Sequence, residues 1–335
     1  MVRSEIKEIL VSRLRFMGDV ILTTPLLNVL RENFPNARIT YIAETPYHSL
    51  LENHPAVDRV WGFRLESRKD QARLFSKLLK THFDIAIDLF GNPRSALLTY
   101  LSGAPYRIGG DFRGRKIFYT HRIKDDGIPK SAVKFHLQYL KALEISYKVY
   151  DPAIFVSPEE KTWAKQYLEN RGFNLQQKIV AIHPGAAWPA KRWFPERFAA
   201  LANKLVSGTG AQMFFIVNPD KEAIVQSVID RCNFSVPVPE VLTLRHLAAV
   251  ISLCDVLVSN DCGVMHMAPA VGTRVVGIFG PGEPEIWFPY SQEKGHRLVY
   301  HEIECSRCHQ DFCHRMDCMK AVTVEDVYQA VLDVL

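Results

Sequence analysis

The sequence lacks the glycine-rich loops that mark two large classes of nucleotide-binding enzymes. The loop after the first apolar segment, residues 7–12, contains one glycine, Gly18, so the G-x-G-x-x-G fingerprint of dinucleotide-binding oxidoreductases is absent. No G-x-x-x-x-G-K-[ST] motif follows a strand-like segment, which argues against a P-loop enzyme. A nucleotide would therefore have to be bound by another kind of loop.

Long hydrophobic runs are also missing from the N-terminal region. The apolar run Ile9–Ser12 is far shorter than a secretion-signal core or a membrane span, so we expect a cytoplasmic protein. The cysteines agree with this expectation, because three of the seven are scattered and four lie within residues 305–318. An odd number of cysteines also argues against a full disulfide framework.

The chain has 335 residues, which suits two domains of about 150 residues each. Its net charge of +5 is unevenly distributed. Residues 1–150 contain 24 Lys and Arg against 15 Asp and Glu, whereas residues 151–335 contain 17 against 21. The basic first half suggests an anionic partner, for which nucleic acid, phosphorylated lipid and an anionic membrane surface all qualify; a solvated basic face is the alternative.

Strand-like and helix-like segments alternate in two series, separated by a polar stretch that contains Pro152 and Pro158. We therefore predict an α/β fold with two Rossmann-like, doubly wound domains, residues 1–155 and 156–335, and an active site in the cleft between them. The first series predicts strands at 7–12, 37–43, 57–63 and 83–88, and helices at 19–34, 46–53, 69–81, 94–101 and 132–145. The second predicts strands at 179–183, 212–217, 256–259 and 275–279, and helices at 195–206, 221–230, 244–252 and 263–271.

Asp19 is the first candidate for chemistry, because it lies where the first strand meets the first long helix. Gly18 lets the chain turn tightly before it. An aspartate at this point is also a favourable cap or first-turn residue that complements the helix dipole. Position alone does not separate this structural role from that of a proton acceptor.

Two loops of the second half have the chemistry of a diphosphate site. The strand 179–183 ends in His-Pro-Gly-Ala-Ala, whose small side chains let backbone amides approach an anion, and Lys191 and Arg192 follow. The strand 256–259 runs into Asp261-Cys262-Gly263, where amides at a helix start could bind a phosphate oxygen, with His266 one turn further on. Gly280-Pro281-Gly282 supplies a third permissive loop. A proline-rich turn with solvated basic residues is the alternative reading of the first loop.

Taken in order, these segments resemble the glycosyltransferase family that contains the ADP-heptose:lipopolysaccharide heptosyltransferases, glycosyltransferase family 9. The resemblance covers nearly the whole chain. It lies in Met17–Val20 with Thr24–Leu26, Asp88–Ser95, Arg107–Gly109, His183–Gly185 with Lys191–Trp193, Asp261–Gly263 with His266, and Phe279–Pro281.

The resemblance implies a GT-B architecture, in which residues 1–155 bind the acceptor and residues 156–335 the nucleotide sugar. It implies an inverting, metal-independent transfer of heptose from ADP-heptose to the inner core of a lipopolysaccharide precursor. Asp19 matches the family's general base, and Lys191 matches the lysine that contacts the donor and stabilises the leaving diphosphate. The implied donor-binding residues are Gly18, Gly185, Ala186, Lys191, Asp261, Cys262, Gly263 and His266. The family often has Thr at the position of Cys262, and a thiol is a poorer hydrogen-bond donor, so only the backbone role is expected there.

The family's acceptors are phosphorylated, carboxylate-bearing, lipid-linked saccharides at the inner face of the bacterial cytoplasmic membrane. Such a lipid, rather than nucleic acid, would then be the partner of the basic half, and membrane attachment would be peripheral and salt-sensitive. The candidate acceptor-binding residues are Arg15, Arg94, Arg113, Arg115 and Lys116, with Arg13 and Arg122 as further candidates.

The cysteine tail has the ligand type for a structural metal site. Cys305, Cys308, Cys313 and Cys318 could hold a tetrahedral zinc ion, although we slightly favour structural thiols or disulfides over a bound metal. No catalytic role is expected for this cluster, and no cofactor is expected to be required.

Other functions remain compatible with the sequence. One is another GT-B enzyme, either a transferase with a different nucleotide-sugar donor or a nucleotide-sugar epimerase. The other is a non-catalytic protein that binds an anionic ligand through the basic half.

Overall fold

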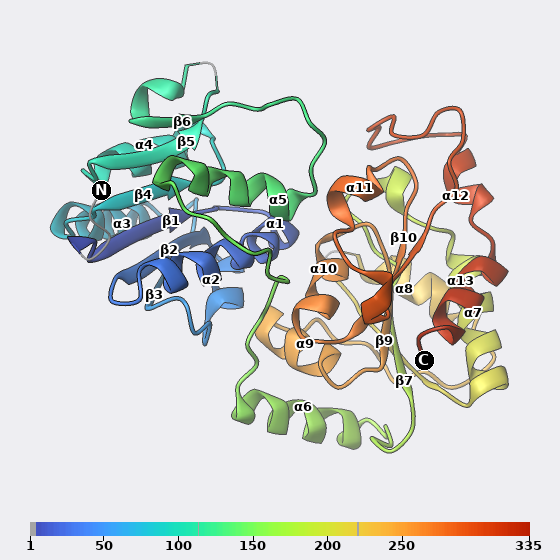
Figure 1. Ribbon diagram of the computed structural model, residues 1–335. Coiled ribbons are helices and arrows are strands. Elements are labelled where there is room, and N and C mark those ends of the chain that lie inside the picture. The colour runs from blue at the N-terminus through green and yellow to red at the C-terminus, as the bar shows by residue number, and fades with distance from the viewer. Residues whose placement is uncertain (1–4, 113, 220) are drawn as a thin grey trace. The chain divides into compact units, whose positions relative to one another are not determined.

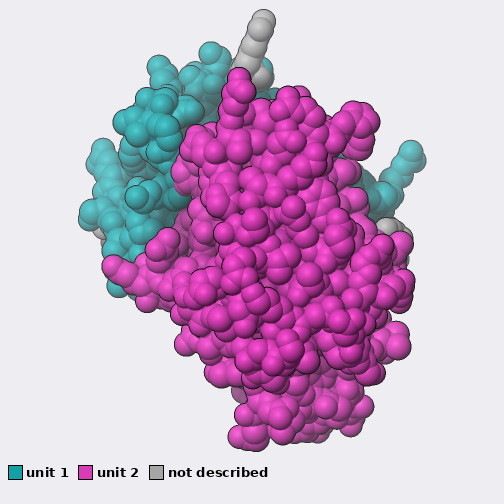
Figure 2. Space-filling view, turned by 90° about the vertical axis from the view of Figure 1, so that its right-hand side faces the viewer, with its two compact units in different colours: residues 1–155 teal, residues 156–335 magenta. Residues whose placement is uncertain are grey.

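The computed structural model describes residues 5–112, 114–219 and 221–335. The chain divides into two compact units, Met1–Phe155 and Val156–Leu335, coloured separately in Figure 2. Each unit is built around its own sheet, labelled in Figure 1. No helix in the described ranges is long and apolar enough to cross a membrane.

Unit 1 contains a parallel sheet in the order β3-β2-β1-β4-β5-β6, the strand order of dinucleotide-binding Rossmann domains. Its strands are β1 (Glu8–Ser12), β2 (Arg38–Glu44), β3 (Arg59–Phe63), β4 (Ile85–Asp88), β5 (Tyr106–Gly110) and β6 (His121–Ile123). Its helices are α1 (Met17–Leu22), α2 (Thr24–Asn33), α3 (Arg68–Lys80), α4 (Pro93–Leu101) and α5 (Ala132–Leu137), with 3₁₀ turns η2 (Tyr47–Leu51), η3 (Lys116–Phe118) and η4 (Gln138–Leu143).

Unit 2 contains a second parallel sheet, in the order β11-β10-β9-β7-β8. Numbered within the unit, this is the flavodoxin-like order, the other common doubly wound arrangement. The strands are β7 (Ile179–His183), β8 (Gln212–Phe215), β9 (Val256–Asn260), β10 (Arg274–Ile278) and β11 (Arg297–Val299). The helices are α6 (Pro158–Asn170), α7 (Pro195–Thr209), α8 (Glu222–Ile229), α9 (Leu244–Ile251), α10 (Gly263–Ala270), α11 (Pro284–Trp287), α12 (Asp317–Ala321) and α13 (Val324–Leu332), with 3₁₀ turns η5 (Pro189–Lys191) and η6 (Gln292–Lys294).

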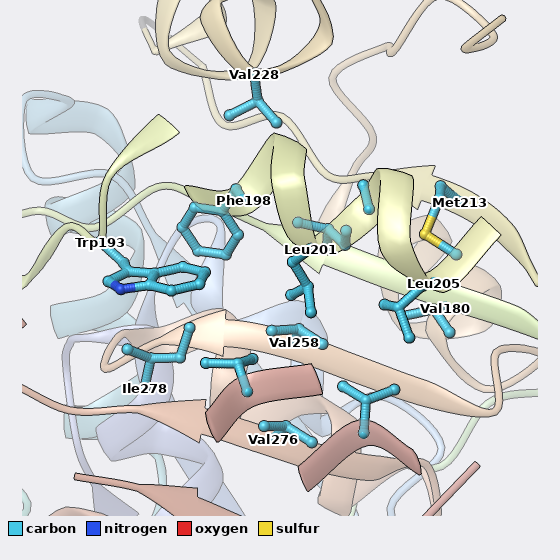
Figure 3. Packing of buried hydrophobic residues seen from close by; sticks show 14 of the residues in the cluster. Val180, Trp193, Phe198, Leu201, Leu205, Met213, Val228, Val258, Val276 and Ile278 are labelled. Carbon is cyan, nitrogen blue, oxygen red and sulfur yellow. The ribbon is translucent and has the colours of Figure 1, made fainter. Parts of the chain in front are cut away.

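The core of unit 2 explains why its strands are apolar along their whole length. Figure 1 places α9 and α10 on one face of the sheet and α7 and α13 on the other. Covered on both faces, a parallel strand has no solvated side and needs no alternation of polar residues. Figure 3 shows Phe198, Leu201 and Leu205 of α7 over Val180 and Val258 of the sheet, all buried. The predicted fold class, α/β with doubly wound parallel sheets, is confirmed.

The predicted helix at 19–34 is wrong in one respect, because it is interrupted at Thr23. Pro25 is the physical reason, since proline has no N–H to donate to the carbonyl of Ile21 and its ring would clash there. The Thr24 hydroxyl donates to that carbonyl instead, at 2.7 Å. The break separates α1, which contains Asp19, from α2.

Further elements also differ from expectation. The polar stretch around Pro158, interpreted as a linker, contains α6, whose start has a reciprocal capping box between Ser157 and Glu160. Strands β5 and β6 were not predicted, since β5 ends in two glycines and β6 has only three residues. The predicted helices at 46–53 and 132–145 are a 3₁₀ turn and a short α-helix followed by a 3₁₀ turn.

Candidate active site

Strand order selects one position in each unit for a ligand. In doubly wound sheets, ligands bind outside the carboxyl ends of the two neighbouring strands from which the chain continues in opposite directions. In unit 1 these strands are β1 and β4, and in unit 2 they are β7 and β9. Asp19 follows β1, whereas the loops containing Lys191 and Asp261 follow β7 and β9, so the candidates occupy both positions.

Asp19 lies in the first turn of α1 and is largely buried. One carboxylate oxygen forms an ion pair with the Arg13 guanidinium, and the other accepts a hydrogen bond from the Phe16 amide at 3.2 Å. Asp19 therefore does serve the helix start. A carboxylate has about four acceptor positions, so these two contacts leave capacity for a substrate proton.

Arg13 joins the two loops of this position. Its Nη1 donates to the Leu89 carbonyl at 2.7 Å, and its guanidinium lies 4.8 Å from the Phe90 ring centroid. The β4 loop is itself anchored by Asp88, which is fully buried. Asp88 accepts from the Phe90 and Gly91 amides at 2.9 Å and from the hydroxyls of Ser95 and Tyr119 at 2.8 and 2.6 Å. Burial raises the pKa of Asp88 although these hydrogen bonds oppose the shift, and we assign it a structural role.

Four of the described acceptor candidates follow the carboxyl ends of adjacent strands, whereas Arg122 lies within β6, where its Nε donates to the Lys116 carbonyl at 3.1 Å. Arg15 follows β1, Arg94 begins α4 after β4, and Arg115 and Lys116 follow β5. The Nε atoms of Arg15 and Arg115 are buried and have no hydrogen-bond partner among the described residues. Arg113 lies outside the described residues.

Glu44 is a residue that sequence reasoning missed. It ends β2 and is buried, and burial raises its pKa while the charges of Arg15 and Arg94 oppose that rise. Its sequence position carried no signal, because a polar residue that ends a strand is common.

Lys191 and Asp261 form the central contact of unit 2. The Lys191 ammonium lies 2.5 Å from Asp261 Oδ2, and their side chains are 17% and 5% exposed. Burial raises the pKa of Asp261, while the Lys191 charge opposes this. Lys191 also lies 4.6 Å above the Trp188 ring centroid. The structure thus brings together two residues that are 70 positions apart in the sequence.

Backbone approach at this site depends on small residues. A Cβ atom at Gly282 would lie 2.6 Å from Asp261 Oδ2, and one at Gly185 would lie 3.0 Å from His183 Nε2. Ala186 is buried beside Gly185, and its carbonyl accepts from Arg192 Nε at 2.9 Å. The loops after β7, β9 and β10 therefore pack closely around one polar cluster.

Asn260, which sequence reasoning did not select, fixes the relative position of two of these loops. It is fully buried, its Oδ1 accepts from the Trp193 amide at 3.0 Å, and its Nδ2 donates to the Pro184 carbonyl at 2.9 Å. A buried side-chain amide bonded to two backbone groups holds both segments in one geometry.

The start of α10 supplies backbone donors. Cys262 is its N-cap and Gly263 its first residue, and the first amides of a helix have no partner within the helix. His266, in the same turn, is buried and shares a 2.8 Å hydrogen bond with the Tyr290 hydroxyl. Burial, aided by the Lys191 charge, lowers the pKa of His266 to about 3, so the imidazole is neutral near pH 7. Gly18, the remaining donor candidate, belongs to unit 1 and is buried in α1.

The cysteine tail contacts two of these loops through its backbone. The Ala190 amide donates to the Asp311 carbonyl at 3.0 Å, and the His309 amide donates to the Pro281 carbonyl at 3.4 Å. All seven cysteines are free thiols, so no disulfide forms. Within residues 5–112, 114–219 and 221–335, no group of three or more His, Cys, Asp or Glu side chains is arranged to hold a metal ion.

Comparison with known proteins decides the family. The family model described as glycosyltransferase family 9 (heptosyltransferase) matches residues 71–318. This chain belongs to glycosyltransferase family 9. The predicted resemblance is confirmed, and so is the prediction of a glycosyltransferase.

Individual relatives agree with this placement. The chain is 25% identical over 294 residues to lipopolysaccharide heptosyltransferase 3 of Escherichia coli, covering 83% of this chain and 85% of that protein. A crystal structure of a glycosyl transferase family 9 protein from Veillonella parvula is similar with a TM-score of 0.85 and 25% identity, covering 99% and 98% of the two chains. The E. coli heptosyltransferase WaaC with ADP-2-deoxy-2-fluoro heptose has a TM-score of 0.74 and 19% identity over 97% and 99% of the chains, which supports the GT-B fold.

Proposed function

We propose that this glycosyltransferase transfers heptose from ADP-heptose to the inner core of a lipopolysaccharide precursor, by an inverting, general-base mechanism. The observation that carries the proposal is the cluster at the carboxyl ends of β7, β9 and β10, where Lys191, the α10 N-terminus and three small-residue loops converge. The family match supports heptosyl transfer. The ADP-sugar named for the similar WaaC structure supports the choice of donor.

Unit 2 would bind the donor. The diphosphate would lie against the amides of Gly185, Ala186, Cys262 and Gly263, where a helix N-terminus favours negative charge. Lys191, held by Asp261, would stabilise the charge that develops on the leaving ADP. His266 is neutral and can donate or accept a hydrogen bond without adding charge.

Unit 1 would bind the acceptor and supply the base. Asp19 would take the proton from the acceptor hydroxyl while that oxygen attacks the anomeric carbon from the face opposite the leaving diphosphate. Arg13 would orient the carboxylate through their ion pair.

Arg15, Arg94, Arg113, Arg115 and Lys116 would bind the phosphates and carboxylates of a lipid-linked acceptor. The unpartnered Nε atoms of Arg15 and Arg115 support this role among the described residues, since a buried guanidinium donor favours an anionic partner. Contact with the cytoplasmic face of the inner membrane would then be peripheral, and binding to anionic vesicles should weaken as salt rises.

A nucleotide series tests the donor assignment. Because a ligand that binds only the folded state raises the melting temperature, ADP should stabilise the protein more than UDP or GDP at equal concentration. Stronger stabilisation by UDP or GDP would contradict the heptosyl assignment while leaving a glycosyltransferase with another donor.

We propose that the transfer itself needs no metal, and zinc at Cys305, Cys308, Cys313 and Cys318 remains a separate structural prediction. Thiolates are suitable zinc ligands, but the described residues contain no group of three or more His, Cys, Asp or Glu side chains arranged to hold a metal ion, so the prediction rests on ligand type alone. Elemental analysis of protein purified without chelators tests this, with about one zinc per chain expected if the site forms. A zinc content near zero would leave the tail as four structural thiols.

A further inference from the structure

The side chain of Cys262 contacts two other polar side chains, although only the backbone of Cys262 is used in the proposed donor site. Strand pairing aligns His183 at the end of β7 with Ser259 of β9, so their side chains lie side by side under the start of α10. His183 Nδ1 is 3.3 Å from Cys262 Sγ and 3.4 Å from Ser259 Oγ, and the two Oγ and Sγ atoms are 3.4 Å apart. Three polar side chains from three segments thus meet at one point.

Hydrogen bonding indicates which groups share a proton there. The Ser259 hydroxyl donates its single hydrogen to the Asn260 carbonyl at 2.9 Å, so Ser259 acts as an acceptor toward the other two side chains. His183 and Cys262 are then the two groups that exchange a proton. His183 is fully buried, and its Nε2 has no hydrogen-bond partner among the described residues, so the ring interacts with Cys262 and Ser259 through Nδ1.

We propose that Cys262 is a modification site, a thiolate paired with the His183 imidazolium that reacts with small uncharged electrophiles. In this reaction the thiolate sulfur forms a bond to the electrophilic carbon, the leaving group departs with its electron pair, and the proton stays on His183. Cys262 as a residue is partly exposed, which is why the reagent proposed below is small and uncharged.

The surroundings favour the thiolate. Burial alone would raise the pKa of the Cys262 thiol, but the His183 charge and hydrogen bonds from His183 and the Met265 amide oppose this rise, and the pKa lies below its usual value. Cys262 also caps the N-terminus of an eight-residue helix, whose dipole favours negative charge. The other charged groups nearby do not oppose it, since Asp261 is paired with Lys191 and His266 is neutral.

The consequence for activity rests on the proposed function. An adduct on Cys262 would occupy the space beside the Gly263 amide, where the donor diphosphate is proposed to bind. Alkylation should therefore prevent ADP binding, and bound ADP should protect the thiol.

The test is the rate of iodoacetamide labelling of each cysteine in the full chain, followed by mass spectrometry from pH 5.5 to 9. At pH 6 an ordinary thiol is about 0.3% thiolate, so in protein first treated with EDTA to remove any bound zinc, Cys262 should label at least about fivefold faster than the exposed Cys305 and Cys308. Cys232 is a matched, partly exposed control, because burial raises its pKa to about 11 and it should remain unlabelled at pH 6. Labelling of Cys262 that is no faster than that of Cys305 at pH 6 would overturn the proposal.

Two further measurements test the reactivity of Cys262 and the proposed position of the donor independently. His183→Gln should move the labelling profile of Cys262 to higher pH, and circular dichroism checks that this variant folds. If it does not fold, the wild-type pH profile still decides the question. Saturating ADP should slow Cys262 labelling at least about tenfold and leave Cys305 unchanged. If Cys262 labels fast but ADP does not slow the labelling, the thiol is reactive as proposed, whereas the proposed position of the donor is contradicted.

Discussion

Lys191→Met should destabilise unit 2, because it leaves the Asp261 carboxylate buried without its cation. Asp261 is 5% exposed and its ammonium partner is 17% exposed. Removing one member of a buried ion pair lowers the free energy of unfolding by about 3–5 kcal/mol. Because Lys191 is partly exposed, we expect a smaller loss here, about 2–3 kcal/mol. For a unit of this size the melting temperature should fall by about 5–10 °C.

The stability lost in Lys191→Met should increase as the pH rises. Burial already places the pKa of Asp261 in the folded protein above its value in the unfolded chain, and removal of Lys191 raises it further. The native variant then binds more protons than its unfolded state at pH values above about 4, so its stability falls as the pH rises through this range. The difference from wild type should be largest at pH 7–8 and smallest near pH 4.

Calorimetry of wild type, Lys191→Met and the double variant Lys191→Met, Asp261→Asn measures these effects and separates the transitions of the two units where they differ. The double variant should recover most of the lost stability at pH 7.5, because the uncompensated charge is gone. A single variant as stable as wild type, or a double variant no better than the single one, would refute the assigned ion pair.

Three other predictions concern activity. Asp19→Asn should lower turnover about 10²- to 10⁴-fold with ADP affinity unchanged, measured by ADP release and by calorimetric titration; unchanged turnover would exclude Asp19 as the base. Gly282→Ala should weaken ADP binding about tenfold, because the new Cβ would lie 2.6 Å from Asp261 Oδ2. This effect should disappear in an Asp261→Ala background, and its persistence there would implicate another contact. Treatment with EDTA should leave the transfer rate within about twofold, whereas a larger loss restored by a divalent cation would contradict metal-independent transfer.

The sequence predicted the parts of the fold that depend on local pattern. Buried parallel strands are continuous apolar runs, so most central strands, such as β7 and β9, are found within one or two residues of the prediction. Short or glycine-containing outer strands carry too few apolar residues to be recognised, as β5 and β6 illustrate. The start of α6 was recognisable from its capping box, but the prolines around it were interpreted as a linker.

The sequence allowed the residues of the candidate site to be selected, but not the contacts between their side chains. Lys191, Asp261 and the glycines were selected because small and charged residues follow strands. Their pairing depends on which strands are neighbours, and so does the meeting of His183 with Ser259 and Cys262. Asn260 and Glu44 were missed for the same reason, since a single polar residue at a strand end reveals its partners only once the strand order is known.

Acceptor-dependent release of ADP from ADP-heptose tests the central claim most directly. With purified protein and a lipid-linked, phosphorylated inner-core acceptor, ADP should appear together with an acceptor whose mass has increased by one heptose. Neither product should form when the acceptor is omitted. Turnover of the nucleotide sugar without acceptor, or no heptosylated product when both substrates are present, would contradict the account.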